Sequence, residues 1–117
     1  MKVIFFKVEG LLNNPESGAR APSGQIGVAT PCLKAFKRIT PGSQIVLIGE
    51  WTKDWDFDDA KCTKDGAYLN RKLDREGLHI MTKTNDIQAW LDRHPNVTEY
   101  CVLSSLDSIT WEKREQA

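Results

Sequence analysis

The chain has 117 residues, a length typical of one domain, and 40% of them are hydrophobic. Sixteen basic residues balance sixteen acidic ones, so the net charge gives no support for binding to nucleic acid or to a membrane surface. No apolar run approaches the roughly 20 residues of a membrane span, and the charged N-terminal segment does not resemble a signal peptide, so we expect a cytoplasmic protein without a membrane partner.

Cysteine usage indicates neither a disulfide framework nor a zinc site. The three cysteines, Cys32, Cys62 and Cys101, are odd in number and widely spaced, with no C-x-x-C pair. Cys101 lies in the apolar run 100–103 and is expected to be a small core residue. The two histidines are isolated from each other, which favours surface or structural roles.

The first predicted element is a strand at Val3–Val8, in the stretch MKVIFFKVEGLLNN. Its end is unusual, because Lys7 and Glu9 are two residues apart and therefore face the same side of the strand. Gly10 then breaks the run. Two charged side chains on one face at the end of a buried strand are unusual, which makes Lys7 and Glu9 candidates for a functional site.

Residues 13–27 carry two prolines and three glycines without periodicity, which predicts a long loop. This loop is either mobile or contacts a ligand through Arg20. Thr30 as the N-cap and Pro31 at the first helical position predict a helix that Pro41–Gly42 ends. Three residues form its core-facing stripe: Leu33, Phe36 and Ile39.

A continuous apolar strand is predicted at Gln44–Ile48, and Gly49 ends it. The following segment, WTKDWDFDDAK, is aromatic and acidic. It lacks the glycine of a calcium-binding loop, so we expect an acidic helix start with its three aromatic side chains packed inward. As a second interpretation, Trp55 is exposed and contacts a partner. The aromatic residues are Trp51, Trp55 and Phe57.

Five further elements are predicted in the second half of the chain. The last two predicted strands flank an amphipathic helix in DIQAWLDRH, which Thr84 or Asn85 caps and Pro95 ends. Its core-facing residues are Ile87, Trp90 and Leu91. In chain order the other elements are a helix at Tyr68–Arg75 closed by Gly77, a strand at Leu78–Met81, a strand at Thr98–Leu103 and a terminal helix at Ile109–Gln116.

Alternating strands and helices predict an α/β fold: a three-layer, Rossmann-like domain over residues 1–117, with a mostly parallel sheet and helices on both faces. In such sheets ligands bind at the carboxyl ends of the strands. Loop 13–27 is expected to lie over these ends, with no separate cap domain. The residues that follow the apolar runs are Lys7, Glu9, Gly10, Gly49, Glu50, Ser104, Ser105 and Asp107.

The strand ends KVEGLLN, IVLIGEW and VLSSLD, together with the helix AWLDRHP, resemble the haloacid dehalogenase (HAD) superfamily. The resemblance covers nearly the whole chain and is greatest to small, capless phosphatase-like members related to polynucleotide 3'-phosphatases and RNA-repair domains. It implies a nucleophile at position 7, a general acid/base at 9, a phosphate-binding hydroxyl at 49 and metal-binding carboxylates at 104 and 105. It also implies a lysine that stabilises the phosphoaspartate, and Lys83 is the candidate for this role.

In this chain those positions hold Lys7, Glu9, Gly49, Ser104 and Ser105. A protonated lysine has no lone pair, and a neutral amine would form a phosphoramidate instead of the family's phosphoaspartate. Magnesium is poorly held by serine hydroxyls. The resemblance therefore implies a pseudoenzyme without a metal cofactor, which binds a protein partner or a phosphate-bearing ligand.

Two other interpretations stay open. The first is an active phosphomonoester hydrolase, acting on nucleic-acid ends or on a small molecule with Mg²⁺, in which Glu9, Glu50 or Asp107 replaces the lost aspartate. The second is a structural domain without a small ligand. In the pseudoenzyme, the Lys7 ammonium and the backbone N–H groups after Gly10 and Gly49 hold an anion, with Lys83 nearby. Nucleic-acid binding follows only from the family resemblance.

Lys7 is expected either to pair with Glu9 or Asp107, and so to replace part of the missing metal charge, or to extend into solvent.

Overall fold

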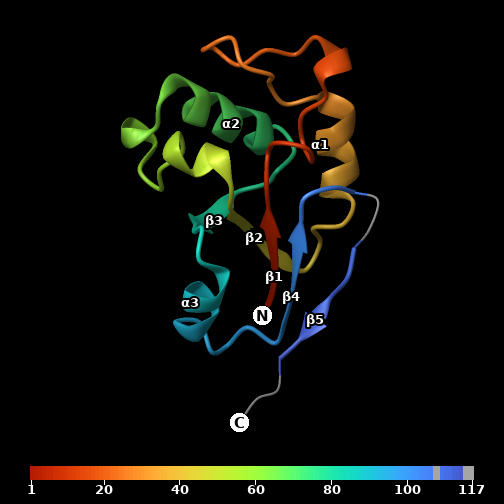
Figure 1. The fold of residues 1–117 in the computed structure, drawn as a ribbon, viewed down its shortest axis with the longest axis vertical. Coiled ribbons are helices and arrows are strands. Elements are labelled where there is room, and N and C mark those ends of the chain that lie inside the picture. Colours follow the sequence, from red (N-terminus) through yellow and green to blue (C-terminus); the bar gives the residue numbers. More distant parts are fainter. Residues whose placement is uncertain (107–108, 115–117) are drawn as a thin grey trace.

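The computed structural model describes residues 1–106 and 109–114. A five-stranded sheet in the order β3-β2-β1-β4-β5 forms its centre (Figure 1). The first four strands are parallel and the last is antiparallel to its neighbour: β1 (Lys2–Phe6), β2 (Ser43–Leu47), β3 (Ile80–Lys83), β4 (Glu99–Leu103) and β5 (Glu112–Lys113). The α/β class with a mostly parallel sheet is confirmed, and the four parallel strands lie within two residues of their expected bounds.

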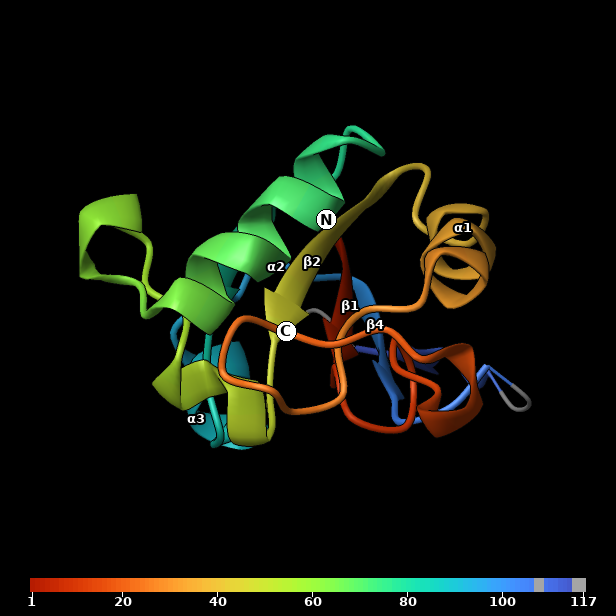
Figure 2. The same ribbon diagram turned by 90° about the horizontal axis from the view of Figure 1, so that it is seen from above.

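Helices pack on both faces of the sheet (Figure 2). Helices α1 (Thr30–Lys37) and α2 (Lys64–Asp74) contribute Leu33 and Leu69, among others, to one core. Helix α3 (Ile87–Asp92) contributes Trp90 and Leu91 to the other. This arrangement is compatible with a Rossmann-like fold.

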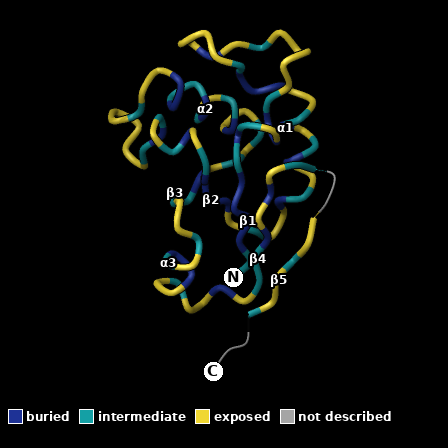
Figure 3. Tube along the Cα trace, viewed as in Figure 1, coloured by how far each residue is buried: buried dark blue, intermediate teal, exposed yellow. Residues whose placement is uncertain are grey.

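Strand β1 divides the two cores because its side chains alternate in direction. Ile4 and Phe6 join the core under α1 and α2, whereas Val3 and Phe5 join the core under α3. All four are fully buried, and Figure 3 shows this central strand as part of the dark interior. Cys101 is a core residue as expected, and burial raises the pKa of its thiol to about 11. No helix in the described parts of the chain is long and apolar enough to cross a membrane.

Capping side chains fix the starts of two helices, and neither start is the expected one. The Thr63 hydroxyl accepts a hydrogen bond from the Gly66 N–H at 3.2 Å, so α2 starts before the expected Tyr68. The Asp86 carboxylate caps α3 by accepting from the Ala89 N–H at 3.0 Å, in place of the expected Thr84 or Asn85. Ala29, without a capping side chain, takes the N-cap position expected for Thr30.

The expected terminal helix is wrong for the part of it that the structure describes. Instead, Glu112–Lys113 forms β5 beside β4. The reason is packing: Trp111 lies against the core on one side of the segment, and the Lys2 ammonium lies 4.6 Å from its ring centroid. The Arg114 guanidinium then donates to the carbonyls of His94 and Val97 at 2.9 and 3.2 Å. These contacts favour an extended chain over a helix.

The aromatic, acidic segment forms two short 3-10 helices, η2 (Glu50–Lys53) and η3 (Asp59–Lys61), and not one helix start. Trp51 and Trp55 are buried as expected. Phe57 is 82% exposed, which corrects the expectation that it packs inward. The interpretation of Trp55 as an exposed partner contact is also wrong, because only 4% of it is exposed and its indole N–H donates to Asn70 Oδ1 at 2.7 Å.

Loop 13–27 lies above the carboxyl ends of the strands (Figure 1) and is tied down, which argues against a mobile segment. It contains η1 (Pro15–Ser17) and the isolated bridge between Arg20 and Ile26. The Asp65 carboxylate, in the first turn of α2, accepts hydrogen bonds from the Ser23 N–H at 2.9 Å, the Ser23 hydroxyl at 2.6 Å and the Gln25 amide. The loop is therefore one wall of the region where the strands end.

Candidate functional site

The carboxyl ends of three parallel strands meet at one edge of the sheet. The register places Phe6 between Leu47 of β2 and Leu103 of β4. Pairing continues one step further, because the Lys7 N–H donates to the Leu103 carbonyl at 3.2 Å and the Ile48 N–H to the Phe6 carbonyl at 2.9 Å. The residues just beyond these bonds are the ones that sequence analysis selected.

Glu9 is packed into this edge. Its Oε1 accepts a hydrogen bond from the Glu50 N–H at 3.0 Å, and the carboxylate lies so close to Gly49 that a Cβ atom there would overlap it. Its Oε2 is buried and has no hydrogen-bond partner among the described residues. A buried acceptor without a partner costs stability and is a natural point for a ligand to donate a hydrogen bond.

Gly49 is held in a backbone conformation that glycine alone adopts readily, with φ +88° and ψ −161°. Its N–H donates to Asn85 Oδ1 at 2.8 Å, and its carbonyl accepts from the Thr52 hydroxyl at 2.7 Å. Asn85 Nδ2 completes the ring of bonds by donating to Thr52 Oγ1 at 2.9 Å. Two side chains thus fix the end of β2.

The backbone N–H groups expected to hold an anion are engaged within the protein. The Glu50 N–H donates to Glu9, and the Leu11 N–H donates to the Val8 carbonyl at 3.2 Å. The Gly10 N–H itself donates to Asn13 Oδ1 at 2.9 Å. Oxygen atoms of the chain therefore occupy the positions that an anion would need, which corrects that part of the expectation.

Lys7 does not form the expected ion pair with Glu9, although both side chains lie against Gly49. A Cβ atom at Gly49 would lie 3.2 Å from Lys7 Cγ. Asp107, the other expected partner, lies outside the described residues. On the β4 side of the edge, Ser104 is exposed and its carbonyl lies 3.2 Å from where a Gly10 Cβ would be.

Lys83, at the end of β3, is turned away from these groups. Its ammonium donates to the Thr52 carbonyl at 2.7 Å and to the Trp55 carbonyl. These carbonyls belong to η2 and the residues after it, so the lysine fastens this segment to the sheet. The expectation that Lys83 binds a ligand phosphate is at odds with this geometry.

Replacing Lys83 by methionine is expected to lower the free energy of unfolding by about 2 kcal/mol, because two part-buried carbonyls lose a charged donor. Lys53→Met is the matched control: the Lys53 side chain is 70% exposed, and its change should stay within about 0.5 kcal/mol. Urea unfolding of both variants measures the difference. Equal stabilities would contradict the role of Lys83 as a fastener.

A cavity of about 490 Å³ opens between the strand ends and loop 13–27. Glu9 and Glu50 line it from the sheet side, Arg20 from the loop, and Trp51 and Lys53 from η2. Lys53 and Glu50 form an ion pair at 3.7 Å. Of the residues selected from the sequence, Glu9, Glu50 and Arg20 line the cavity, whereas Lys7, Gly49 and Lys83 do not.

Asn85 and Thr52 organise this edge, and sequence analysis assigned them no site role. Asn85 was expected only as a helix cap. Its position just after the third strand could have indicated a site role, because the segments that follow parallel strands meet at the same edge of the sheet. Thr52 gave no signal, since its role depends on the path of η2.

The described residues at the positions that the resemblance assigns do not fit Mg²⁺. Mg²⁺ is usually bound through carboxylate oxygens, and these positions hold an ammonium group at Lys7 and hydroxyl groups at Ser104 and Ser105. Within residues 1–106 and 109–114, no group of three or more His, Cys, Asp or Glu side chains is placed to hold a metal ion.

Comparison with known proteins leaves the family of the chain open. No family model matches it, and neither a curated protein nor a solved structure is significantly similar to it.

Proposed function

We propose that this chain is a three-layer, Rossmann-like domain of the HAD type that binds a ligand or a partner without metal-dependent phosphatase activity. One observation carries the proposal: the polar groups at the strand ends serve as structural groups. The Glu9 carboxylate holds the Glu50 N–H, and the Lys83 ammonium holds the η2 carbonyls. A catalytic acid/base must instead be free to exchange a proton with the substrate.

The chemistry of position 7 supports the same conclusion. Lys7 stands where the resemblance requires an aspartate nucleophile, and an ammonium group has no lone pair with which to attack phosphorus. The cavity over the strand ends carries two carboxylates and two cations, from Glu9, Glu50, Arg20 and Lys53. Such a lining suits a ligand that has both a negative group, placed toward Arg20, and a hydrogen-bond donor, placed toward Glu9.

Hydrolase activity with an atypical site is the second candidate. Glu9 Oε2 favours it, because this oxygen makes no hydrogen bond to a described residue and the side chain lines the cavity. In that case Glu9 would attack phosphorus or activate water, and Glu50 would be the remaining carboxylate.

Both candidates are tested by assaying hydrolysis of p-nitrophenyl phosphate and of a 3'-phosphorylated oligonucleotide, with Mg²⁺ titrated by calorimetry in the same samples. We expect neither heat nor turnover, and we expect Lys7→Asp alone to restore neither. Turnover that Glu9→Gln abolishes, and that Glu112→Gln on the exposed strand β5 leaves unchanged, would overturn the non-catalytic proposal.

A further inference from the structure

Strand β3 forms an edge of the sheet that is poorly protected against pairing. It bonds to β2 on one side and is the terminal strand of the sheet order. Proteins commonly guard such an edge with a lysine that extends into solvent. The lysine of β3 is Lys83, and its ammonium is turned inward to the carbonyls of Thr52 and Trp55.

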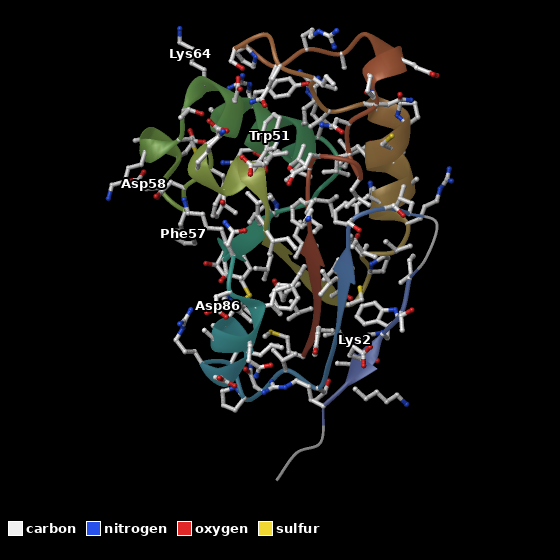
Figure 4. All side chains as sticks on the ribbon, in the orientation of Figure 1. Lys2, Trp51, Phe57, Asp58, Lys64 and Asp86 are labelled. Atoms are coloured by element: carbon white, nitrogen blue, oxygen red, sulfur yellow. The ribbon has the colours of Figure 1, made fainter. Side chains whose placement is uncertain are left out.

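A groove of about 420 Å³ lies beside this edge, away from the cavity over the strand ends. Its apolar lining comes from Trp55, Phe57 and Ile80, and Ile80 belongs to β3 itself. Phe57 is 82% exposed, and Figure 4 shows it at the outer margin of the molecule on the β3 side. The groove therefore joins an open backbone edge to an exposed aromatic ring.

The backbone on both sides of Phe57 is fixed before anything binds. Asp56 Oδ1 accepts a hydrogen bond from the Asp58 N–H at 2.8 Å, which closes a turn over Phe57. Asp58 Oδ1 then accepts from the Ala60 N–H at 3.1 Å. An aromatic side chain on such a backbone loses little conformational entropy on binding, so it can serve as an anchor.

The charge around this groove is mainly negative. Asp59 and Asp74 line it, and Asp58 stands beside Phe57 at the margin of the molecule (Figure 4). Asp74 is close to His79, with 3.0 Å between Oδ1 and Nδ1. Arg71 is a cation in the lining. Lys61, another cation, belongs to η3 and is not part of the lining. Electrostatic complementarity favours a basic partner over an acidic one.

We propose that the groove docks a short extended segment of another protein, in which Lys or Arg alternates with large apolar residues. The segment adds as a strand to the open edge of β3. Its apolar residues pack into the groove against Phe57 and Ile80. Its cations are attracted by the negative charge around the groove, to which Asp58 and Asp59 contribute. The short length of β3, Ile80–Lys83, limits the paired part to about four residues.

The probe is a fluorescein-labelled octapeptide of alternating lysine and valine, titrated into the full chain and followed by fluorescence anisotropy. A peptide of alternating glutamate and valine is the charge control. We expect saturable binding of the basic peptide that weakens as salt is raised, and at least about tenfold weaker binding to Phe57→Ser. Arg71→Gln should bind a few-fold more tightly, because the lining loses its cation.

Val102→Ser is the matched control. Val102 is 46% exposed and belongs to β4, which β2 and β1 separate from β3 in the sheet. Binding by this variant should equal that of the wild type. The Thr84 N–H donates to the Leu47 carbonyl of β2, so the alternate amides of Met81 and Lys83 face the open edge. Their hydrogen exchange should slow in the complex, which a contact through side chains alone would not produce. Equal binding of both peptides, or undiminished binding by Phe57→Ser, would overturn the proposal. A concentration-dependent dimer that Phe57→Ser abolishes, without peptide binding, would assign the groove to self-association and also overturn it.

Discussion

Replacing Asp65 by alanine is expected to lower the free energy of unfolding by about 3 kcal/mol. The carboxylate is 4% exposed and accepts hydrogen bonds from the Ser23 N–H, the Ser23 hydroxyl and the Gln25 amide. The alanine variant leaves these donors without an acceptor and removes a negative charge from the first turn of α2. Urea unfolding followed by tryptophan fluorescence measures the loss.

A double-mutant cycle with Ser23→Ala separates the contact between loop and helix from the effect on the helix alone. Ser23 is exposed and contacts Asp65 from the loop side, so its single variant does not disturb α2. If the contact carries the stability, the effects of Ser23→Ala and Asp65→Ala should be non-additive by about 1 kcal/mol. Additive effects would mean that Asp65 acts through the Ser23 N–H, the Gln25 amide or the helix terminus, and not through the Ser23 hydroxyl.

The same carboxylate makes a pH dependence predictable. Burial by itself raises the pKa of Asp65, but the hydrogen bonds from the Ser23 and Gln25 side chains and from the Ser23 backbone together hold it below its usual 3.8. A group with a lowered folded-state pKa stabilises the fold above its unfolded-state pKa and loses this contribution as pH falls through the folded-state value. The stability difference between wild type and Asp65→Ala should be constant down to about pH 5 and shrink below about pH 4.

Loop 13–27 depends on this anchor, and the cavity depends on the loop. Arg20, Gln25 and Ile26 line the cavity over the strand ends, and the loop segment between them is held through Ser23. Asp65→Ala should therefore also weaken ligand binding there, without any change in the residues that contact the ligand. Binding at the β3 groove should be unaffected, because none of its lining residues belongs to the loop.

The order of strands and helices was predictable from the sequence because each segment has a local cause. Two patterns predicted burial from the sequence alone: the continuous apolar run Gln44–Ile48, and the helical spacing of Ile87, Trp90 and Leu91. The structure of the C-terminal segment was not predictable, because Trp111 contacts Lys2 and Arg114 donates to carbonyls that follow α3. Contacts between residues so distant in sequence produce no local hydrophobic pattern.

The location of the candidate site was predictable for a similar reason. Parallel strands bring their carboxyl ends together, so Glu9 and Glu50 meet whatever the side chains are. Their hydrogen bonds were not predictable. Lys83 and Phe57 illustrate this: one is turned inward and the other outward by the path of the segment 50–62, which no local pattern encodes.

Gly49→Ser restores the type of residue that the resemblance assigns to the end of the second strand, yet we expect it to lower the free energy of unfolding by about 4 kcal/mol. The backbone at Gly49 has φ +88° and ψ −161°, where a side chain is strained. The added Cβ would also overlap the Glu9 carboxylate. Gly77→Ser is the control, because its φ of +71° is also positive but a Cβ there meets nothing within 4 Å.

Combining Gly49→Ser with Glu9→Ala divides the cost into its two causes. Glu9→Ala alone is the reference, because it already loses the bond from the Glu50 N–H. Adding Gly49→Ser to Glu9→Ala should cost less than adding it to the wild type, because the overlap is gone and only the backbone strain remains. A Gly49→Ser variant as stable as the wild type would contradict the assigned backbone. If the cost is found, a hydroxyl cannot be returned to position 49 by one substitution, because Glu9, Asn85 and Thr52 fix a conformation of Gly49 that excludes it. The backbone conformation at this strand end, and not only its side chain, then excludes the hydroxyl that the resemblance assigns to position 49.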